Sequence, residues 1–594
     1  MTVKIPLLEG KFLSKIALVA FLLTLPLSVR KVFFVLSPDG SGIFNEYTDI
    51  SLYLSDITLF ILLLVIILEN KKNILSILWW KKMFHVEHLL VPLLAPLPFL
   101  FWSALSILWS KSEILAFYAT FRLFEGYFLY LAIIFFIVPR GTMIEFYENC
   151  STWNNLMAIK NYKKMFHVEQ LSEKPLTSNS IEEIVPRGTI DIFTKRIKNC
   201  STWNNLDIVF IVIIASGLIQ AIIAILQFAI QSSLGLIFLK ESVFFPSQSG
   251  IAKIVLENDV LIRSYGLFPH PNILGFFLGL SILLTITYPL ITGKKLFHVE
   301  QFIPLYRGML FIQVLSFLLA FSKSAYISII LAILYYFTTL FHVEHVSNTV
   351  INVKNVPRGT IQTIKKWLIT KCSTWNNSFK VHKMFHVEHR KYLASISILV
   401  FLPFLFLIKV DWFYFFVQPI TERYFFFQEF FAIAHQNFFT GVGIGQSVFL
   451  MQDFFSEKLN LWQLQPIHSL YLLIFSEIGF IGFVFFLLFI LILIVPRGTI
   501  LRFRGKLKKC STWNISKNNA YGRQKVFHVE HFTQITENVP RGTFRMGISY
   551  RAGRVLIIFV LFIAFFDHYL FDIQQGQLLF WLVLGLCSVF MKKE

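Results

Sequence analysis

Long apolar runs, interrupted by short polar or charged stretches, account for most of the 594-residue chain. Many of these runs come close to the about 20 residues that an α-helix needs to cross the hydrocarbon core of a bilayer. The first run is followed by many others, so we interpret it as a helix and not as a cleaved signal peptide. We predict membrane helices at residues 13–29, 50–68, 89–109, 114–137, 207–230, 271–292, 303–321, 324–340, 392–409, 468–494, 553–571 and 575–592.

The composition favours a fold that faces lipid. Hydrophobic residues make up 56% of the chain, charged residues only 15%, and the mean hydropathy is +0.65. A soluble protein carries roughly 25% charged residues, and a soluble core does not need the 68 phenylalanines that this chain contains. We therefore predict an all-α fold, a polytopic transmembrane bundle of about 12 helices. It forms a single membrane domain over residues 1–594.

Three short peptide words recur along the chain. Cys-Ser-Thr-Trp-Asn begins at positions 150, 200, 372 and 510, Phe-His-Val-Glu at 84, 166, 297, 341, 385 and 527, and Val-Pro-Arg-Gly-Thr at 138, 185, 356, 495 and 539. The words share no residue pattern, but each matches one of the three reading frames of a single possible gene sequence, the palindrome TGTTCCACGTGGAACA. The residues beside all fifteen copies agree with the codons that each frame requires. The repeats therefore record a DNA element and not a protein motif.

Such insertions persist where they disturb no packing, which favours surface loops. We predict that 138–206, 340–391 and 495–552 are cytoplasmic loops expanded by repeat-derived inserts. Ten of the fifteen histidines and four of the five cysteines lie in or beside the words. Their spacing follows from codons and so does not indicate a metal site. We predict neither a metal nor a cofactor.

The basic residues that give the chain its formal net charge of +20 are concentrated in alternate loops. They follow the second and sixth predicted helices and fill the loop before the ninth. An excess of lysine and arginine is typical of cytoplasmic loops. The alternation predicts that both termini lie in the cytoplasm and that the 410–467 loop is extracytoplasmic. No basic stretch forms a recognisable nucleic-acid module, so no nucleic-acid partner is predicted.

Cationic side chains mark three segments on the predicted outer side. Arg263 begins the run R-S-Y-G-L-F-P-H-P-N, which ends at Asn272 and whose prolines delay the next helix. Lys323 lies between the seventh and eighth predicted helices, and Arg423 lies in the long outer loop. Arginine and lysine at helix ends often only extend to lipid headgroups. Convergence of these segments on one face is what favours a functional site.

Two histidines belong to the same face. His435 precedes the glycine turn G-V-G-I-G, and His468 stands at the mouth of the tenth predicted helix. A neutral imidazole near an acceptor hydroxyl can act as a general base. The alternative for a lone interfacial histidine is a structural hydrogen bond. The glycine turn is too short to be a nucleotide loop.

Three charged residues fall inside predicted helices. Arg122 and Glu125 are three apart in the fourth helix and can pair on one face, and Asp56 lies in the second helix. A charged side chain at such depth in a membrane has a high free-energy cost, and such residues are usually paired or functional. A structural ion pair and a substrate contact both remain open for them.

Several runs, taken in order, resemble the O-antigen ligase and polymerase superfamily. They are R-S-Y-G-L-F-P-H-P-N-I-L-G-F-F-L, S-K-S-A-Y, the 423–445 segment, H-S-L-Y-L-L-I-F-S-E-I-G-F-I-G and the tail D-H-Y-L-F-D-I-Q-Q-G-Q-L-L-F-W. The resemblance implies a C-type glycosyltransferase of the cytoplasmic (inner) membrane that acts in polysaccharide or lipopolysaccharide assembly. Such proteins transfer a glycan from undecaprenyl diphosphate to an acceptor hydroxyl on the outer side, without a metal.

The resemblance also implies roles for individual residues and partners. The catalytic residues are His468 and Arg263, and the substrate-binding residues are Lys323, Arg423, Asn272 and His435. Lys323 stands where the family usually has arginine, and lysine cannot make a bidentate contact with phosphate. The implied partners are a lipid-linked glycan donor, a lipid, glycan or protein acceptor, and membrane lipids.

Four assignments remain open. Within the same superfamily, the chain is either a ligase, a polysaccharide polymerase or a protein O-oligosaccharyltransferase. The alternative from another class is a membrane transporter, because charged residues inside interrupted helices also suit transport. The long outer loop, and the lack of an inverted repeat between the two halves of the sequence, favour glycan transfer.

Overall fold

A computed structural model describes residues 12–36, 42, 44–74, 92–137, 205–248, 250–256, 259–292, 303–348, 417–460, 463–494 and 541–590. This part of the chain is mostly helical, with almost no sheet. Its principal helices are α1 (Phe12–Thr24), α2 (Leu54–Ile74), α5 (Leu97–Leu105), α6 (Glu113–Ala132), α9 (Asn205–Ile230), α10 (Pro271–Thr292), α11 (Ile303–Leu319), α12 (Lys323–Asn348), α15 (Gln418–Gln436), α17 (Leu470–Ile494), α19 (Arg541–Phe566) and α21 (Gln574–Phe590). Each predicted membrane range contains a helix except 392–409, which lies outside the described residues.

Five helical stretches of the described chain are long and apolar enough to cross a membrane. They are Pro92–Trp109, Glu113–Phe135, Asn205–Ile230, Pro271–Tyr288 and Leu470–Ile494. Shorter apolar helices, among them α1 and α21, pack between and beside them. The predicted polytopic membrane character thus agrees with these five stretches.

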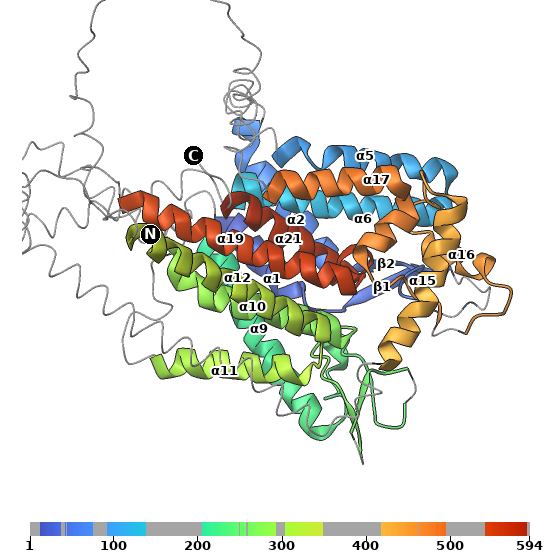
Figure 1. The fold of residues 1–594 in the computed structure, drawn as a ribbon, viewed down its shortest axis with the longest axis horizontal. Helices are drawn as coiled ribbons and strands as arrows, with labels where there is room; N and C mark the ends of the chain where they lie inside the picture. Colours follow the sequence, from blue (N-terminus) through green and yellow to red (C-terminus); the bar gives the residue numbers. More distant parts are fainter. Residues whose placement is uncertain are drawn as a thin grey trace, which may run out of the picture.

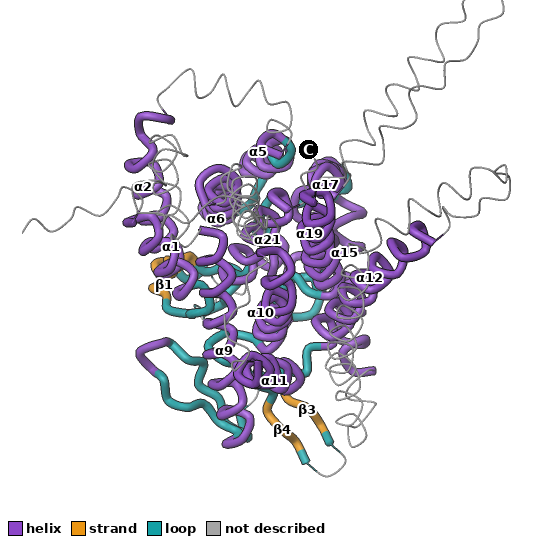
Figure 2. The backbone as a smooth tube through the Cα atoms, turned by 90° about the vertical axis from the view of Figure 1, so that its left-hand side faces the viewer, coloured by secondary structure: helices purple, strands orange, loops and turns teal. Residues whose placement is uncertain are grey.

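Two short antiparallel hairpins interrupt the helical fold. Strand β1 (Arg30–Phe34) pairs with β2 (Ile50–Tyr53), and β3 (Lys253–Val255) pairs with β4 (Val260–Ile262) (Figure 2). The all-α prediction left β1, β3 and β4 in loops and placed β2 at the start of the predicted helix 50–68. Each strand has three to five residues, which is too short for an alternating pattern to reveal.

Most of the long helices lie along one common direction, and the connections between them fall at two opposite ends of the bundle (Figure 1). One end carries the β1–β2 hairpin, α15, which lies across the helix ends, and the breaks at 110–112, 320–322 and 567–573. We refer to it as the hairpin end. The opposite end holds the helix termini that flank the repeat-bearing segments, namely Ile137, Asn205, Thr292, Ile303, Asn348, Ile494 and Arg541.

The centre of the bundle is built around α21 and α10, whose residues are buried almost throughout. Helix α21 packs against α6, α19 and the short helix α20 (Tyr569–Asp572), and α10 packs against α9, α11 and α19. Gly126 of α6 makes room for the indole of Trp581, because a Cβ at position 126 would overlap that ring. The Trp581 ring also stacks on Phe489 at 5.7 Å. This close packing fixes the helix ends that build the hairpin end.

The structure corrects several predicted loop boundaries. Helix α12 continues to Asn348 and so includes the repeat word at 341–344, which has neither proline nor glycine to end a helix. Helix α19 begins at Arg541, directly after Pro540, and therefore takes up part of the predicted 495–552 loop. Residues 205–206 of the predicted 138–206 loop belong to α9. The 410–467 loop contains α15 and the short helix α16 (Ser447–Leu450).

Candidate functional site

A buried carboxylate lies at the hairpin end, where α19 stops. Asp567 accepts hydrogen bonds from the hydroxyl of Ser324 and from Nδ2 of Asn272, the latter at 2.9 Å. Ser324 is in the first turn of α12, and Asn272 is in the first turn of α10. Asp567 thus ties three helix ends together. Burial raises the pKa of Asp567, although Ser324 and the positive charge of Arg423 act in the opposite direction.

Arg263 joins this group through Asn272. Its Nη2 donates to Oδ1 of Asn272 at 2.6 Å, and its Nε donates to the carbonyl oxygen of Ala320 at 2.9 Å. Pro269 and Pro271 keep the preceding segment out of the helix, so the arginine and the first turn of α10 face each other. Burial lowers the pKa of Arg263, but a guanidinium remains charged in proteins.

A second arginine reaches the same break from helix α15. Arg423 of α15 donates from Nη2 to the carbonyl oxygen of Phe566 at 3.1 Å, and its guanidinium lies 5.9 Å from the centre of the Phe566 ring. Phe566 is the residue before Asp567. Two cations from segments 160 residues apart therefore act electrostatically on one carboxylate, with Arg263 held at Asn272 and Arg423 held at Phe566.

Two histidine rings stand beside these cations. The His468 ring lies 5.1 Å from the His568 ring, and the edge of Phe426 closes its other side at 5.0 Å. Burial, followed by the positive potentials of His568 and Arg423, lowers the pKa of His468 well below its usual value. His468 is therefore neutral at pH 7, which is the form that accepts a proton.

His568 has the opposite electrostatic balance. Burial opposes its protonation, but its Nδ1 lies 2.7 and 3.0 Å from the two carboxylate oxygens of Asp572. The carboxylate outweighs burial, so the pKa of His568 is raised above its usual value. Burial lowers the pKa of the third nearby histidine, His270, to about 3. Its Nδ1 accepts a hydrogen bond from the backbone amide of Asn272 at 3.1 Å.

The structure therefore brings together most of the predicted site residues. Arg263, Asn272, Arg423 and His468 converge on the break at Asp567. Lys323 lies in the same turn as Ala320 and Ser324 and is half-buried. His435 is exposed near the end of α15, and twelve residues of helix separate it from Arg423. That spacing is roughly 18 Å along the helix axis. Helix α15 therefore carries His435 away from the position at which Arg423 reaches the cluster.

Sequence reasoning missed Asp567, His568 and Asp572. They occur in the run D-H-Y-L-F-D, which interrupts an otherwise apolar C-terminal tail. An aspartate and a histidine between two apolar helices are expensive unless they are paired or functional. That interruption was the available signal.

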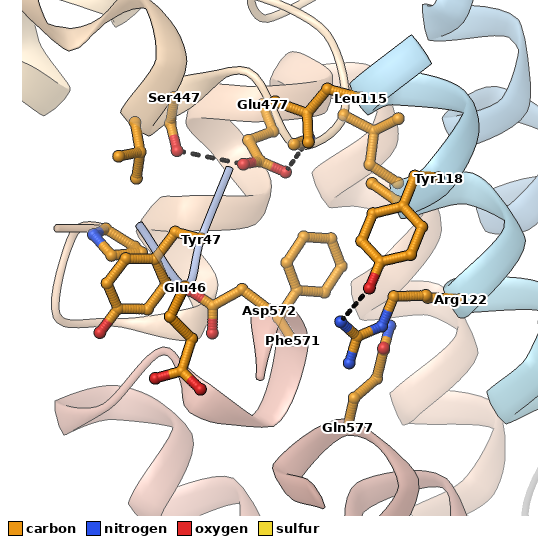
Figure 3. Close-up of a pocket in the computed structure, with 15 residues that line it drawn as sticks. Glu46, Tyr47, Leu115, Tyr118, Arg122, Ser447, Glu477, Phe571, Asp572 and Gln577 are labelled. Carbon is orange, nitrogen blue, oxygen red and sulfur yellow. Dashed lines mark hydrogen bonds between the residues drawn. The ribbon is translucent and has the colours of Figure 1, made fainter. Parts of the chain in front are cut away.

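A small cavity lies beside Asp572, which forms part of its wall (Figure 3). Its volume is about 50 Å³, and it is lined by polar and aromatic groups that include Glu46, Tyr47, Tyr118, Arg122, Ser447, Glu477, Asp572 and Gln577. Glu477 accepts from the Gly445 amide at 2.7 Å and from the Ser447 hydroxyl at 3.0 Å. The cavity is thus walled by the glycine turn on one side and by α6 and α20 (Tyr569–Asp572) on the other.

The charged residues inside α2 and α6 form a buried network. Gln574 donates from Nε2 to Asp56 and to Glu125, the latter at 3.1 Å. Arg122 donates from Nη1 to the hydroxyl of Tyr118 at 3.1 Å. Arg122 and Glu125 are both buried, as the predicted pairing required, but they hydrogen-bond to different partners.

The glycine turn at 441–445 is held by a kink in α17. The Gly443 amide donates to the Glu477 carbonyl at 2.7 Å, and the Phe480 amide donates to the Phe438 carbonyl at 2.8 Å. Gly479, between these contacts, has φ 68° and ψ −176°, a conformation that is essentially restricted to glycine. A Cβ at this position would also overlap the carbonyl oxygen of Phe439. Gly479 therefore lets two segments approach closely and carries Glu477 into the cavity wall.

We expect Gly479→Ala to lower the free energy of unfolding by about 2–5 kcal/mol, because backbone strain and steric overlap add together. Thermal unfolding of the purified protein in detergent measures this. Gly308→Ala in α11 is the matched control, since a Cβ there meets no neighbour. The control is expected to be neutral or slightly stabilising. Equal melting temperatures for the two variants would contradict the assigned role of Gly479.

Comparison of the chain with protein-family models, with curated proteins and with solved structures found no match. A functional assignment therefore rests on the residues described above and on their geometry.

Proposed function

We propose that the protein transfers a glycan from an undecaprenyl-diphosphate-linked donor to an acceptor hydroxyl at the hairpin end of a membrane helix bundle. The observation that carries this proposal is the convergence of Arg263 and Arg423 on the Asp567 break, next to the neutral His468. A cationic site beside a base, at one end of a bundle with membrane-spanning helices, suits a lipid-linked anionic donor. The sequence resemblance to O-antigen ligases and polymerases points to the same chemistry.

The leaving group explains the need for the cations. Transfer breaks the bond between the anomeric carbon and the diphosphate oxygen, and negative charge develops on the departing diphosphate. Preorganised cations at that point stabilise the transition state. Arg263, and Arg423 across from it, supply fixed charges, and Lys323 in the neighbouring turn adds a third.

The acceptor requires a base. In the proposed reaction His468 takes the proton from the acceptor hydroxyl while the oxygen attacks the anomeric carbon. The low pKa of His468 keeps it unprotonated at neutral pH. Asn272 holds Arg263 in place.

The direct test is transfer by the purified protein in lipid nanodiscs, from an undecaprenyl-diphosphate glycan to candidate acceptors. A lipid acceptor identifies a ligase, a second donor glycan identifies a polymerase, and a serine- or threonine-containing protein identifies an O-oligosaccharyltransferase. Transmembrane flux of the donor without any transfer would support a transporter instead.

The proposed orientation has a separate test. The hairpin end is expected to face the extracytoplasmic side, and the cytoplasmic (inner) membrane with both termini in the cytoplasm is the proposed location. Ser456 is exposed in the 410–467 segment. In a background without native cysteines, Ser456→Cys in intact cells should react with an impermeant maleimide, because its thiol faces outward.

The matched control for this labelling is the native Cys372, retained alone, within a repeat word of the proposed cytoplasmic side. It should react only after the cells are opened. Labelling of Cys372 but not of Ser456→Cys in intact cells would invert the orientation.

A further inference from the structure

The turn between α19 and α21 contains a histidine–carboxylate pair that the mechanism above does not use. His568 and Asp572 are four residues apart, and α20 places both side chains on one face. Both carboxylate oxygens of Asp572 lie within hydrogen-bonding distance of Nδ1 of His568, at 2.7 and 3.0 Å. Both side chains are largely removed from solvent. Burial of such a pair costs desolvation free energy, which only a close and well-oriented contact offsets.

The pair lies directly behind the proposed base. The ring centres of His568 and His468 are 5.1 Å apart, with an angle of 44° between the ring planes. The edge of Tyr47 covers the His568 ring at 5.5 Å. Because Nδ1 is engaged by Asp572, Nε2 is the nitrogen of His568 that is left to exchange a proton with a neighbouring group.

We propose that His468 passes the acceptor proton to His568 and that Asp572 holds it there, so that these two residues act as positioning residues behind the base. This inference rests on the proposed glycan transfer. The acceptor oxygen forms the new bond to the anomeric carbon, and the diphosphate leaves with the electron pair of the broken bond. The hydroxyl proton moves to His468 and then to His568.

The electrostatic surroundings favour this direction of transfer. The titratable groups that face His568 are Asp567 and Asp572 from its own turn, Glu46 and Tyr47 from the segment before β2, His468 from the turn before α17, and His270 from the turn before α10. The acidic members raise the pKa of His568 despite its burial, whereas burial lowers the pKa of His468. A proton is therefore more stable on His568 than on His468.

The cavity gives the proton a way out. Asp572, which contacts His568, also lines the cavity. Glu46 and Glu477 are further acidic residues of the cavity wall (Figure 3). A polar cavity of about 50 Å³ has room for water, since about 10–15 Å³ is enough for one molecule. Water at this position can take the proton from His568 between turnovers and return the pair to its resting state.

The test is the pH dependence of single-turnover transfer by the wild type, Asp572→Asn, Asp572→Glu and His568→Asn in nanodiscs, with donor binding measured in parallel. His568 must be unprotonated to accept, so the wild-type rate rises with pH through the pKa of His568. Asp572→Asn removes the carboxylate that raises this pKa. In this variant the rise of the transfer rate with pH should move to lower pH by about one unit or more. The maximal rate reached at high pH should fall about 10- to 100-fold.

His568→Asn should lower the plateau by about 10²-fold, leaving a pH dependence that reports His468 at lower pH. Asp572→Glu should restore the wild-type position in part, because it restores the charge. Asp453→Asn is the matched control, since Asp453 is exposed at the same end and pairs only with Lys111 among the described residues. It should leave the profile unchanged.

The outcomes separate the two proposals. If the wild type transfers and Asp572→Asn keeps both its plateau and its pH dependence, the pair is structural and this inference is wrong. If Asp572→Asn loses donor binding together with activity, the pair only supports the fold. If the wild type transfers to none of the acceptors, the proposed function itself is wrong.

Discussion

Arg263→Ala is expected to abolish detectable glycan transfer, with a loss of at least about 10³-fold, and to weaken donor binding. Removal of a single group that stabilises developing negative charge typically costs 10²–10³-fold. Arg263 contributes more than charge, because it also orients Asn272 toward Asp567 and holds the Ala320 turn beside Lys323. The measurement is the initial rate of transfer in nanodiscs, together with the affinity for the lipid-diphosphate donor.

Two further variants make this result interpretable. Arg263→Lys keeps a charge but loses the bidentate fork, so it should recover part of the donor affinity. Lys111→Ala removes another cation from the hairpin end, one that is exposed and paired with Asp453 at 2.7 Å. It should stay within about twofold of wild type, since exposed pairs contribute little. If Arg263→Ala kept a near-normal transfer rate and donor affinity, the donor would have to bind at another site.

His468→Gln is expected to lower the transfer rate by about 10²–10⁴-fold while donor binding stays nearly intact. Glutamine preserves a hydrogen bond but cannot take a proton at neutral pH. Because burial lowers the pKa of His468, the imidazole is already unprotonated at pH 7, and the deficit should persist at higher pH. Single-turnover transfer at several pH values, with saturating donor, measures the effect on the chemical step.

His435→Gln is the matched control for this variant. His435 was predicted from the sequence to belong to the same site, but it is exposed near the end of α15. We expect its rate to stay within about twofold of wild type, as is usual for surface substitutions away from a site. If His468→Gln kept the wild-type rate, His468 would only position substrate and catalysis would depend on the cations.

A continuous apolar signal was sufficient to predict most of the described long helices, but not α15 (Gln418–Gln436), which lies within the predicted 410–467 loop. Predicted and observed helices coincide closely at α9, α10 and α17, where charged residues or prolines limit the apolar run. The same signal could not reveal the hairpins at 30–53 and 253–262, since a strand of three to five residues has no usable periodicity.

The candidate site was only partly predictable for a related reason. Arg263, Arg423 and His468 stand out because each interrupts an apolar context on the predicted outer side. Their meeting at Asp567 depends on three-dimensional packing that no spacing in the chain expresses. His435 has the same local signal as His468, and only the direction of α15 separates the two. The pairing of His568 with Asp572 is visible as a four-residue spacing, but its closeness to His468 is not.

The distribution of the repeat words has a practical consequence. The described helix termini that flank the repeat-bearing segments lie at the end of the bundle opposite the hairpins, and the word at 341–344 lies within α12. We therefore expect that fluorescent reporters, affinity tags or rigid fiducial domains for electron microscopy can be grafted beside these helix termini. The short connections at 110–112, 320–322 and 567–573 are the positions to leave intact.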